Sequence, residues 1–174
     1  MLTVVSDTHG RDSHRLTGRT LEAVREADLV VHAGDFMTET VLDAFYREAR
    51  TLRAVYGNND DGAIRERLPE ARTVEYGGVQ FAVTHTRRGG PTALSLFGRE
   101  RNADAVVFGH SHRPTFDATG EIPLLNPGSH AQPRGYRAAH VELEPVNGGL
   151  RGRFCTPGGE VFDRFDLPAA GTIG

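Results

Sequence analysis

Five short apolar runs, spread over the first two thirds of the chain, constrain its fold more than any other feature. They read LTVV, ADLVVHAG, LRAVYG, VQFAVTH and ADAVVFGH, at residues 2–5, 27–34, 52–57, 79–85 and 103–110. A strand that is apolar at nearly every position is covered on both faces, which is typical of a parallel sheet built from βαβ units. We therefore expect an α/β fold.

The segments between these runs have the apolar spacing of helices. One contains Leu16, Leu21 and Val24, and the next contains Val41, Leu42 and Phe45. A short amphipathic helix is expected at 63–68 and another helix at 92–102.

The sequence pattern changes after residue 113, where strand-like stretches alternate with turns instead of helices. These stretches are RPTFDATGEIPLLNPG, YRAAHVELEPVNGGLRGRFC and GEVFDRFDL, with glycine-rich hinges at 147–149 and 157–159. The pattern predicts an antiparallel sheet packed against the first one. Two facing mixed sheets with outer helices would form a four-layer αββα sandwich. On periodicity alone, a three-layer doubly wound fold is the alternative.

Length and composition narrow the class of protein. A chain of 174 residues is long enough for one domain, so we expect a single domain over 1–174. The net charge of -3 and the absence of Trp argue against binding to long nucleic acids. One cysteine, Cys155, cannot form an internal disulfide, and no apolar run reaches membrane-spanning length. We therefore expect a cytoplasmic protein with no membrane partner.

The expected strands end on side chains that bind metals. The seven residues are Asp7, His9, Asp35, Asn58, His85, His110 and His112. Because the carboxyl ends of parallel strands meet at one edge of a sheet, we expect these side chains to converge there. Taken singly, Asp7 and Asp35 could be helix N-caps, Asn58 a turn residue, and each histidine a structural one. We do not expect five separate strand ends to finish this way by accident.

The chemistry of these side chains indicates the kind of ion. Imidazole together with carboxylate suits Mn²⁺, Fe²⁺, Zn²⁺, Co²⁺ or Ni²⁺ better than Ca²⁺ or Mg²⁺. Seven groups are too many for one ion, whereas two ions about 3.5 to 4 Å apart would use them all.

The ordered motifs DxH, GD, GNxD, a lone His, GHxH and NPGS resemble those of the calcineurin-like metallophosphoesterase superfamily, and their spacing resembles its small phosphodiesterases of the YfcE type. The resemblance runs from Asp7 to about Arg134. It implies the αββα sandwich and a phosphoesterase, most readily a phosphodiesterase, in which a metal-bridging hydroxide attacks phosphorus.

The resemblance also implies ligand sets. Asp7, His9, Asp35 and His112 would hold one ion, and Asp35, Asn58, His85 and His110 would hold the second, with Asp35 as the bridge. Mn²⁺ is the expected ion, with Ni²⁺, Fe²⁺, Zn²⁺ and Co²⁺ as alternatives.

Asn59 stands where many relatives carry a histidine that assists the leaving group. An amide can donate a hydrogen bond to a phosphoryl oxygen, but it has no proton to give at neutral pH. We therefore expect catalytic roles for Asp35 and Asn59. We also expect a preference for phosphodiesters, or for esters with good leaving groups, over alkyl phosphomonoesters.

Other residues near the motifs are candidate substrate contacts. Arg87 or Arg88 could bind a phosphate with two hydrogen bonds, although a solvated surface pair explains them equally well. His130 is the nearby imidazole that could replace the missing acid. Thr86 replaces the usual glycine, so the loop is expected to take another path. Asp60 is expected either to cap a helix or to support a ligand, while His14, His32 and His140 are expected to be structural.

Other functions remain open at the level of sequence. A non-catalytic scaffold of the same fold is one, since the resemblance includes retromer subunits. A nuclease or cyclic-nucleotide hydrolase is another. The expected partner is a small phosphodiester substrate, and a homo-oligomer could form through an edge of the second sheet.

Overall fold

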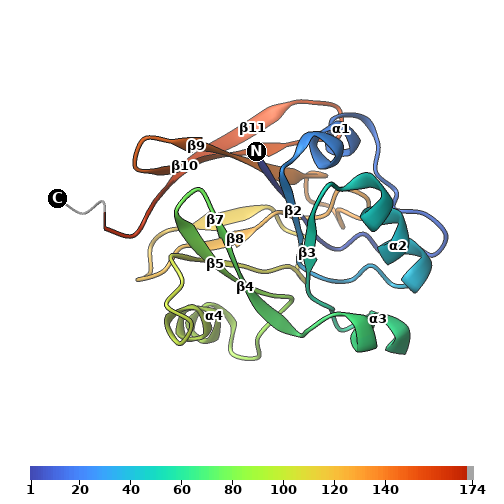
Figure 1. Ribbon diagram of the computed structural model, residues 1–174, viewed down its shortest axis with the longest axis horizontal. Helices are drawn as coiled ribbons and strands as arrows, with labels where there is room; N and C mark the ends of the chain where they lie inside the picture. Colours follow the sequence, from blue (N-terminus) through green and yellow to red (C-terminus); the bar gives the residue numbers. More distant parts are fainter. Residues whose placement is uncertain (172–174) are drawn as a thin grey trace.

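The computed structural model describes residues 1–171, so the last three residues of the expected domain, 172–174, lie outside the described part. Its strands form two sheets (Figure 1). The six-stranded sheet has the order β11-β10-β9-β1-β2-β3. Its strands are β1 (Leu2–Val5), β2 (Leu29–His32), β3 (Leu52–Ala54), β9 (His140–Val146), β10 (Gly149–Cys155) and β11 (Val161–Pro168). β1, β2 and β3 are parallel, and β9 to β11 add to β1 as an antiparallel meander.

The five-stranded sheet has the order β4-β5-β6-β8-β7. Its strands are β4 (Ala71–Tyr76), β5 (Val79–Thr84), β6 (Ala105–Val107), β7 (Thr115–Asp117) and β8 (Leu124–Asn126). β5, β6 and β8 are parallel, and the two edge strands run antiparallel to their neighbours.

Within residues 1–171, four helices cover the outer faces of the sheets: α1 (Gly18–Glu26), α2 (Glu39–Glu48), α3 (Gly62–Arg67) and α4 (Gly90–Arg99). Val24, Phe45 and Ile64 of the first three helices pack against the six-stranded sheet. Leu94 and Phe97 of α4 pack against the five-stranded sheet. Figure 1 shows α1 and α2 beside β2 and β3, with α4 at the opposite side of the molecule.

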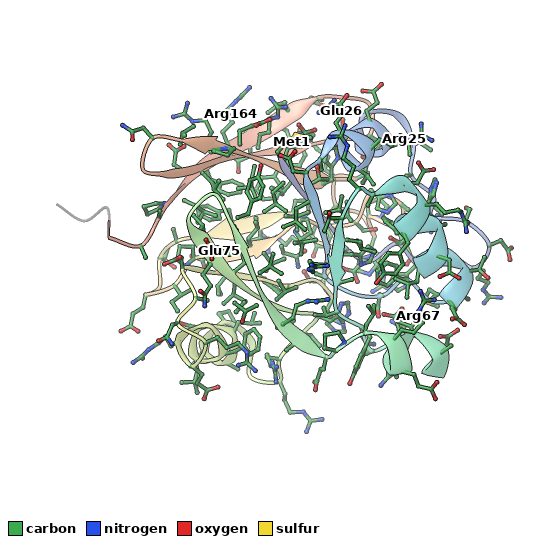
Figure 2. The ribbon with its side chains drawn as sticks, viewed as in Figure 1. Met1, Arg25, Glu26, Arg67, Glu75 and Arg164 are labelled. Atoms are coloured by element: carbon green, nitrogen blue, oxygen red, sulfur yellow. The ribbon has the colours of Figure 1, made fainter. Side chains whose placement is uncertain are left out.

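The main core lies between the two sheets. It combines Phe81 and Val107 of the five-stranded sheet with Leu143 and Phe154 of the six-stranded sheet, all at most 1% exposed. Figure 2 shows charged side chains, including Arg67 and Arg164, at the rim of the molecule. The four-layer αββα sandwich with two mixed sheets is confirmed. No helix in the described part is long and apolar enough to cross a membrane.

The assignment of strands to sheets differs from the sequence expectation. The runs at 79–85 and 103–110 were expected to join the first three strands in one parallel sheet, but β5 and β6 lie in the other sheet. The segments after residue 113 are divided as well, because β7 and β8 join the five-stranded sheet and β9 to β11 join the six-stranded one. Apolar periodicity reports that a strand is buried, but not which sheet buries it.

Local boundaries also differ. β4 was not predicted, because it is an edge strand in which only Val74 is buried. The helix expected at 92–102 begins at Gly90 and ends at Arg99, with Pro91 in its first turn, where the missing N–H costs nothing.

Candidate metal centre

The turns that carry the expected ligands have an unusual backbone. Asp7 and Asp35, which follow β1 and β2, have φ of +55° and +64°, and His9, His110 and His112 also have positive φ. Left-handed backbone is uncommon for residues other than glycine, and it concentrates at functional sites, where surrounding contacts maintain it. Neither aspartate is a helix N-cap, because α1 and α2 begin after Thr17 and Thr38.

Five of the expected ligands form a close group of atoms. Asp7 Oδ1 lies 3.3 Å from His112 Nε2, 3.7 Å from His9 Nε2 and 3.9 Å from His85 Nε2. Asp35 Oδ2 lies 3.2 Å from the Nε2 atoms of both His9 and His85. The two aspartates follow strands of the six-stranded sheet, while His85 follows β5 of the five-stranded sheet.

Asn58 and His110 lie at the more exposed side of this group. The His110 Nδ1 and Asn58 Oδ1 atoms are 3.1 Å apart, and the His110 ring lies 5.4 Å from the ring of His85. The backbone N–H of His110 also donates to Asp7 Oδ2. All seven expected ligands are therefore brought together, although two sheets rather than one deliver them.

Several atoms in the group are buried without a hydrogen-bond partner. They are Asp7 Oδ1 and the Nε2 atoms of His9, His85 and His112. Buried polar atoms are almost always paired, because an unpaired one costs about 1 to 3 kcal/mol. Divalent cations bound between these atoms would give each of them a partner, so the donor set fits a metal.

Two of the histidines are oriented for this task by their other ring nitrogen. His85 Nδ1 lies 2.7 Å from the carbonyl oxygen of Ala33, and His112 Nδ1 contacts the carbonyl oxygen of Gln132. A carbonyl oxygen only accepts, so each Nδ1 carries a hydrogen, and this contact directs each Nε2 into the group.

Charge in the group is balanced between carboxylates and imidazoles. Burial lowers the pKa of His9, but the nearby carboxylates of Asp35 and Asp7 outweigh it and raise this pKa to about 9. Burial likewise opposes the charge on Asp35, yet His85 and His9 hold the pKa of Asp35 below its usual range. The two carboxylates therefore attract positive charge to this point.

At two positions beside this group, the backbone approaches the carboxylates so closely that glycine is required. A Cβ atom on Gly57 would lie 2.1 Å from Asp35 Oδ1. A Cβ atom on Gly109 would lie 2.2 Å from Ser6 Oγ and 2.7 Å from Asp7 Oδ2. Any larger residue at either position would displace a carboxylate of the group.

Asp60 supports the ligand turns rather than capping α3. Its carboxylate accepts hydrogen bonds from the backbone N–H groups of Asp35, Gly57 and Met37, at 3.0, 2.7 and 2.8 Å. The N-cap of α3 is Asp61, which accepts from the N–H of Ile64.

Asn59 binds the carboxylate of Asp35. Its backbone N–H donates to Asp35 Oδ1, and its side-chain Nδ2 donates to Asp35 Oδ2, both at 2.9 Å. We expected this side-chain amide to face a phosphoryl oxygen, but it donates its hydrogen bond to Asp35, which is itself an expected metal ligand.

The position of Arg87 does not favour the contact with substrate that we expected for it. The Arg87 guanidinium lies 4.4 Å from the centre of the Phe97 ring, and Arg101 lies over the same ring at 4.0 Å. Arg88 is exposed. In the loop after His85, the residues with positive φ are Gly89 and Gly90, and Thr86 is not among them.

His130 is buried, which argues against its expected contact with substrate. Its Nε2 lies 3.1 Å from Thr8 Oγ1, and only 6% of the residue is exposed. Burial lowers the pKa of His130 to about 3. At neutral pH this ring therefore has no imidazolium proton to give to a leaving group, contrary to the expectation from sequence.

Residues of the NPGS segment and of the loop before α1 hold the ligand turns, and sequence reasoning missed these roles. Ser129 Oγ donates to the carbonyl oxygen of Asp7 at 2.7 Å, and Asn126 Nδ2 donates to that of Gly109 at 3.0 Å. Arg15 donates to the carbonyl oxygens of Thr8 and Ala131. The NPGS motif signals the first two roles, but no pattern in the sequence singles out Arg15.

The other histidines have structural contacts. His14 Nε2 lies 3.0 Å from Glu48 Oε1, and His32 lies between Thr8 Oγ1 and the N–H of Gly34. His140 lies near Glu142 and Cys155, but this second cluster does not suit a metal. Glu142 already accepts hydrogen bonds from Arg19 and Arg153, two cations, and burial raises the pKa of Cys155 to about 11.

Curated relatives share much of this chain. A probable metallophosphoesterase of Methanocaldococcus jannaschii is 33% identical over 139 residues, which cover 77% of this chain and 70% of the relative. A phosphodiesterase of the same organism is 25% identical over 136 residues, which cover 72% of this chain and 81% of that protein.

Solved structures share the fold. A predicted phosphoesterase from Streptococcus pneumoniae superposes with a TM-score of 0.74 at 27% identity, covering 95% of this chain and 96% of the other. Vps29 from Entamoeba histolytica in complex with Zn²⁺ superposes with a TM-score of 0.75 at 22% identity, covering 95% of this chain and 98% of that one. At that identity the second likeness concerns the fold alone.

The family model for the calcineurin-like phosphoesterase superfamily domain matches residues 1–145, which include all seven expected ligands. The same family is indicated by this match and by the relative at 33% identity, and the two-sheet sandwich is consistent with it. The chain belongs to the calcineurin-like phosphoesterase superfamily.

Proposed function

We propose that this protein is a phosphodiesterase that works with two divalent metal ions held between its two sheets. One observation carries the proposal. Asp7 Oδ1 and the Nε2 atoms of three histidines converge while buried and without hydrogen-bond partners, beside a second carboxylate. No purely structural role accounts for so many unpaired atoms at one point.

The ligand sets follow from matching the family motifs residue by residue. Asp7, His9, Asp35 and His112 would hold one ion, and Asp35, Asn58, His85 and His110 would hold the other. When bound, the ions supply a water of lowered pKa and orient the phosphoryl oxygens. Mn²⁺ is the expected ion, because this donor set suits it and cellular availability selects among similar ions.

The chain's own residues keep this group in place. Asn59 fixes both oxygens of Asp35, which leaves Oδ2 directed at His9 and His85. Asp60 fixes the backbone on either side of this carboxylate. Such contacts preorganise the site, so that little rearrangement is needed when charge develops on the substrate.

The state of the histidines near this group bears on the preferred substrate. His85 and His110 are expected ligands, and His130 is neutral and buried. A leaving group would therefore depart without a proton from one of these side chains. Lost general-acid assistance typically forfeits about 10² to 10⁴ in rate for a poor leaving group, and little for a good one. This favours aryl or otherwise activated phosphodiesters over alkyl monoesters, and one relative is named a phosphodiesterase.

The proposal is tested by stripping the purified protein with a chelator, reloading it with Mn²⁺, Ni²⁺, Fe²⁺, Zn²⁺ or Co²⁺, and comparing two substrates. We expect kcat/KM for an aryl phosphodiester to exceed that for an alkyl monoester such as phosphoserine. A clear preference for the alkyl monoester would refute the leaving-group argument. Tight metal uptake with no hydrolysis of any phosphodiester would favour a non-catalytic scaffold instead.

A further inference from the structure

A hollow of about 200 Å³ opens beside the candidate metal centre. It is lined by Tyr56, Gly57, Asn58, Arg65, Glu70, Thr84, His85 and Thr86. Two of these residues, Asn58 and His85, are expected ligands, so the hollow borders the group that would bind a phosphoryl oxygen. Its other walls come from α3 and from the ends of β3, β4 and β5.

Arg65 is fixed in this hollow. Its Nε donates to the carbonyl oxygen of Asp60 at 3.0 Å, and its Nη2 donates to that of Asn58 at 3.1 Å. The guanidinium also lies 5.0 Å from the centre of the Tyr56 ring. Both partner oxygens are uncharged, so they leave the positive charge of Arg65 without neutralisation, and they tie its position to the turn that carries Asn58.

The lining favours a small polar group. Arg65 offers N–H donors and Glu70 offers carboxylate acceptors, while a hydroxyl group both donates and accepts. At about 30 Å³ for each water molecule, the hollow has room for roughly six or seven waters, which is enough for a three-carbon polyol. A nucleobase would stack on an aromatic face, and Arg65 already lies over one face of the Tyr56 ring.

We propose that this hollow binds the alcohol part of the phosphoester substrate, and that Arg65 and Glu70 select a small alcohol with free hydroxyl groups. The inference rests on the proposed phosphodiesterase function and narrows its substrate class. Arg65 and Glu70 are then specificity-determining residues, whereas the metal-binding group performs the hydrolysis.

Two diesters with the same leaving group test the inference. One is 4-nitrophenyl 2,3-dihydroxypropyl phosphate, and the other is 4-nitrophenyl propyl phosphate, which lacks the two hydroxyl groups. With the Mn²⁺-reloaded protein, we expect kcat/KM to be about tenfold or more higher for the dihydroxypropyl diester, because hydrogen bonds to charged side chains are the stronger ones.

Glu70→Gln is the informative variant, because it removes the charge and keeps the shape. We expect it to lower the preference for the dihydroxypropyl diester several-fold, mainly by raising KM for that diester. Glu66→Gln, on α3 but outside the lining, is the matched control and should keep the wild-type ratio. Arg65→Gln should also lower the ratio, with metal content measured in parallel because Arg65 contacts the Asn58 turn.

A binding measurement gives a readout independent of turnover. Calorimetric titration of the Mn²⁺-loaded protein should show tighter binding of glycerol 3-phosphate than of propyl phosphate, and Glu70→Gln should reduce this difference several-fold. Equal kcat/KM for the two diesters, or equal binding of the two monoesters, would overturn the assignment of the hollow while the phosphodiesterase proposal stands. Failure to hydrolyse either diester would contradict both.

Discussion

Asn59 holds both carboxylate oxygens of Asp35, one through its backbone N–H and one through its side-chain amide, at 2.9 Å each. Asp35 Oδ2 is also the atom that lies 3.2 Å from His9 Nε2 and from His85 Nε2. Asn59 is therefore bound to the carboxylate that would hold both ions under the proposed function.

Asn59→Ala is expected to weaken metal binding. Loss of a residue that orients a metal ligand typically costs about 10- to 100-fold in metal affinity or activity. Calorimetric titration of the chelator-stripped protein with Mn²⁺ measures this directly. Asn147→Ala, in an exposed turn, is the control that should bind like the wild type. Unchanged affinity in Asn59→Ala, together with a raised KM, would instead assign Asn59 to substrate.

Ser129→Ala is expected to destabilise the protein and to loosen the Asp7 turn. The buried hydroxyl donates to the carbonyl oxygen of Asp7 and accepts from the N–H of Gln132, at 2.7 and 2.8 Å. Leaving those groups unpaired should lower the free energy of unfolding by about 1 to 3 kcal/mol, measured by urea denaturation. The exposed Ser13→Ala should change it little, and an equal loss in both variants would contradict the assigned role.

Arg87→Ala is expected to affect stability but not substrate binding. The guanidinium lies over Phe97, a contact worth about 0.5 to 1 kcal/mol at a partly exposed site. Thermal unfolding and steady-state kinetics on an aryl phosphodiester measure the two effects separately. A KM raised tenfold with unchanged stability would restore the role that the sequence suggested for Arg87.

Stability should depend on pH through His130. Its pKa in the folded protein is lowered to about 3, so this contribution to stability is fully present above the ordinary histidine pKa of about 6.5. It should be lost progressively as the pH falls from about 6.5 towards 3. His130→Gln removes the titrating group, so its unfolding free energy should decline less steeply over that range than that of the wild type. Parallel curves for the two proteins would show that His130 does not titrate as its burial implies.

The grouping of the seven expected ligands was predictable because its signal is local. Each lies directly after an apolar run, and such runs end at the edges of sheets whichever sheet they join. The partition of the strands was not predictable from the same signal, since Val83 and Val107 have the same apolar flanks as Val4 and Val31 but belong to the other sheet.

Side-chain partners were the least predictable part of the site. Asn59 and Arg87 each had a reasonable role facing substrate, and their actual partners, Asp35 and Phe97, are 24 and 10 positions away along the chain. His130 follows a motif expected beside the site, yet Thr8 and the neighbouring core bury it. Spacing in sequence carries no information on such contacts, because they depend on the packing of elements from both sheets.

The central claim is that donors from both sheets share two ions through Asp35, and metal content tests it most directly. The protein is stripped with a chelator, reloaded with Mn²⁺, freed of excess ion and measured by elemental mass spectrometry. We predict about two ions per chain in the wild type and in His14→Ala, whose imidazole lies outside the group, and fewer than about one in Asp35→Ala. A wild-type protein that retains no ion, or an Asp35→Ala variant that retains two, would contradict the account.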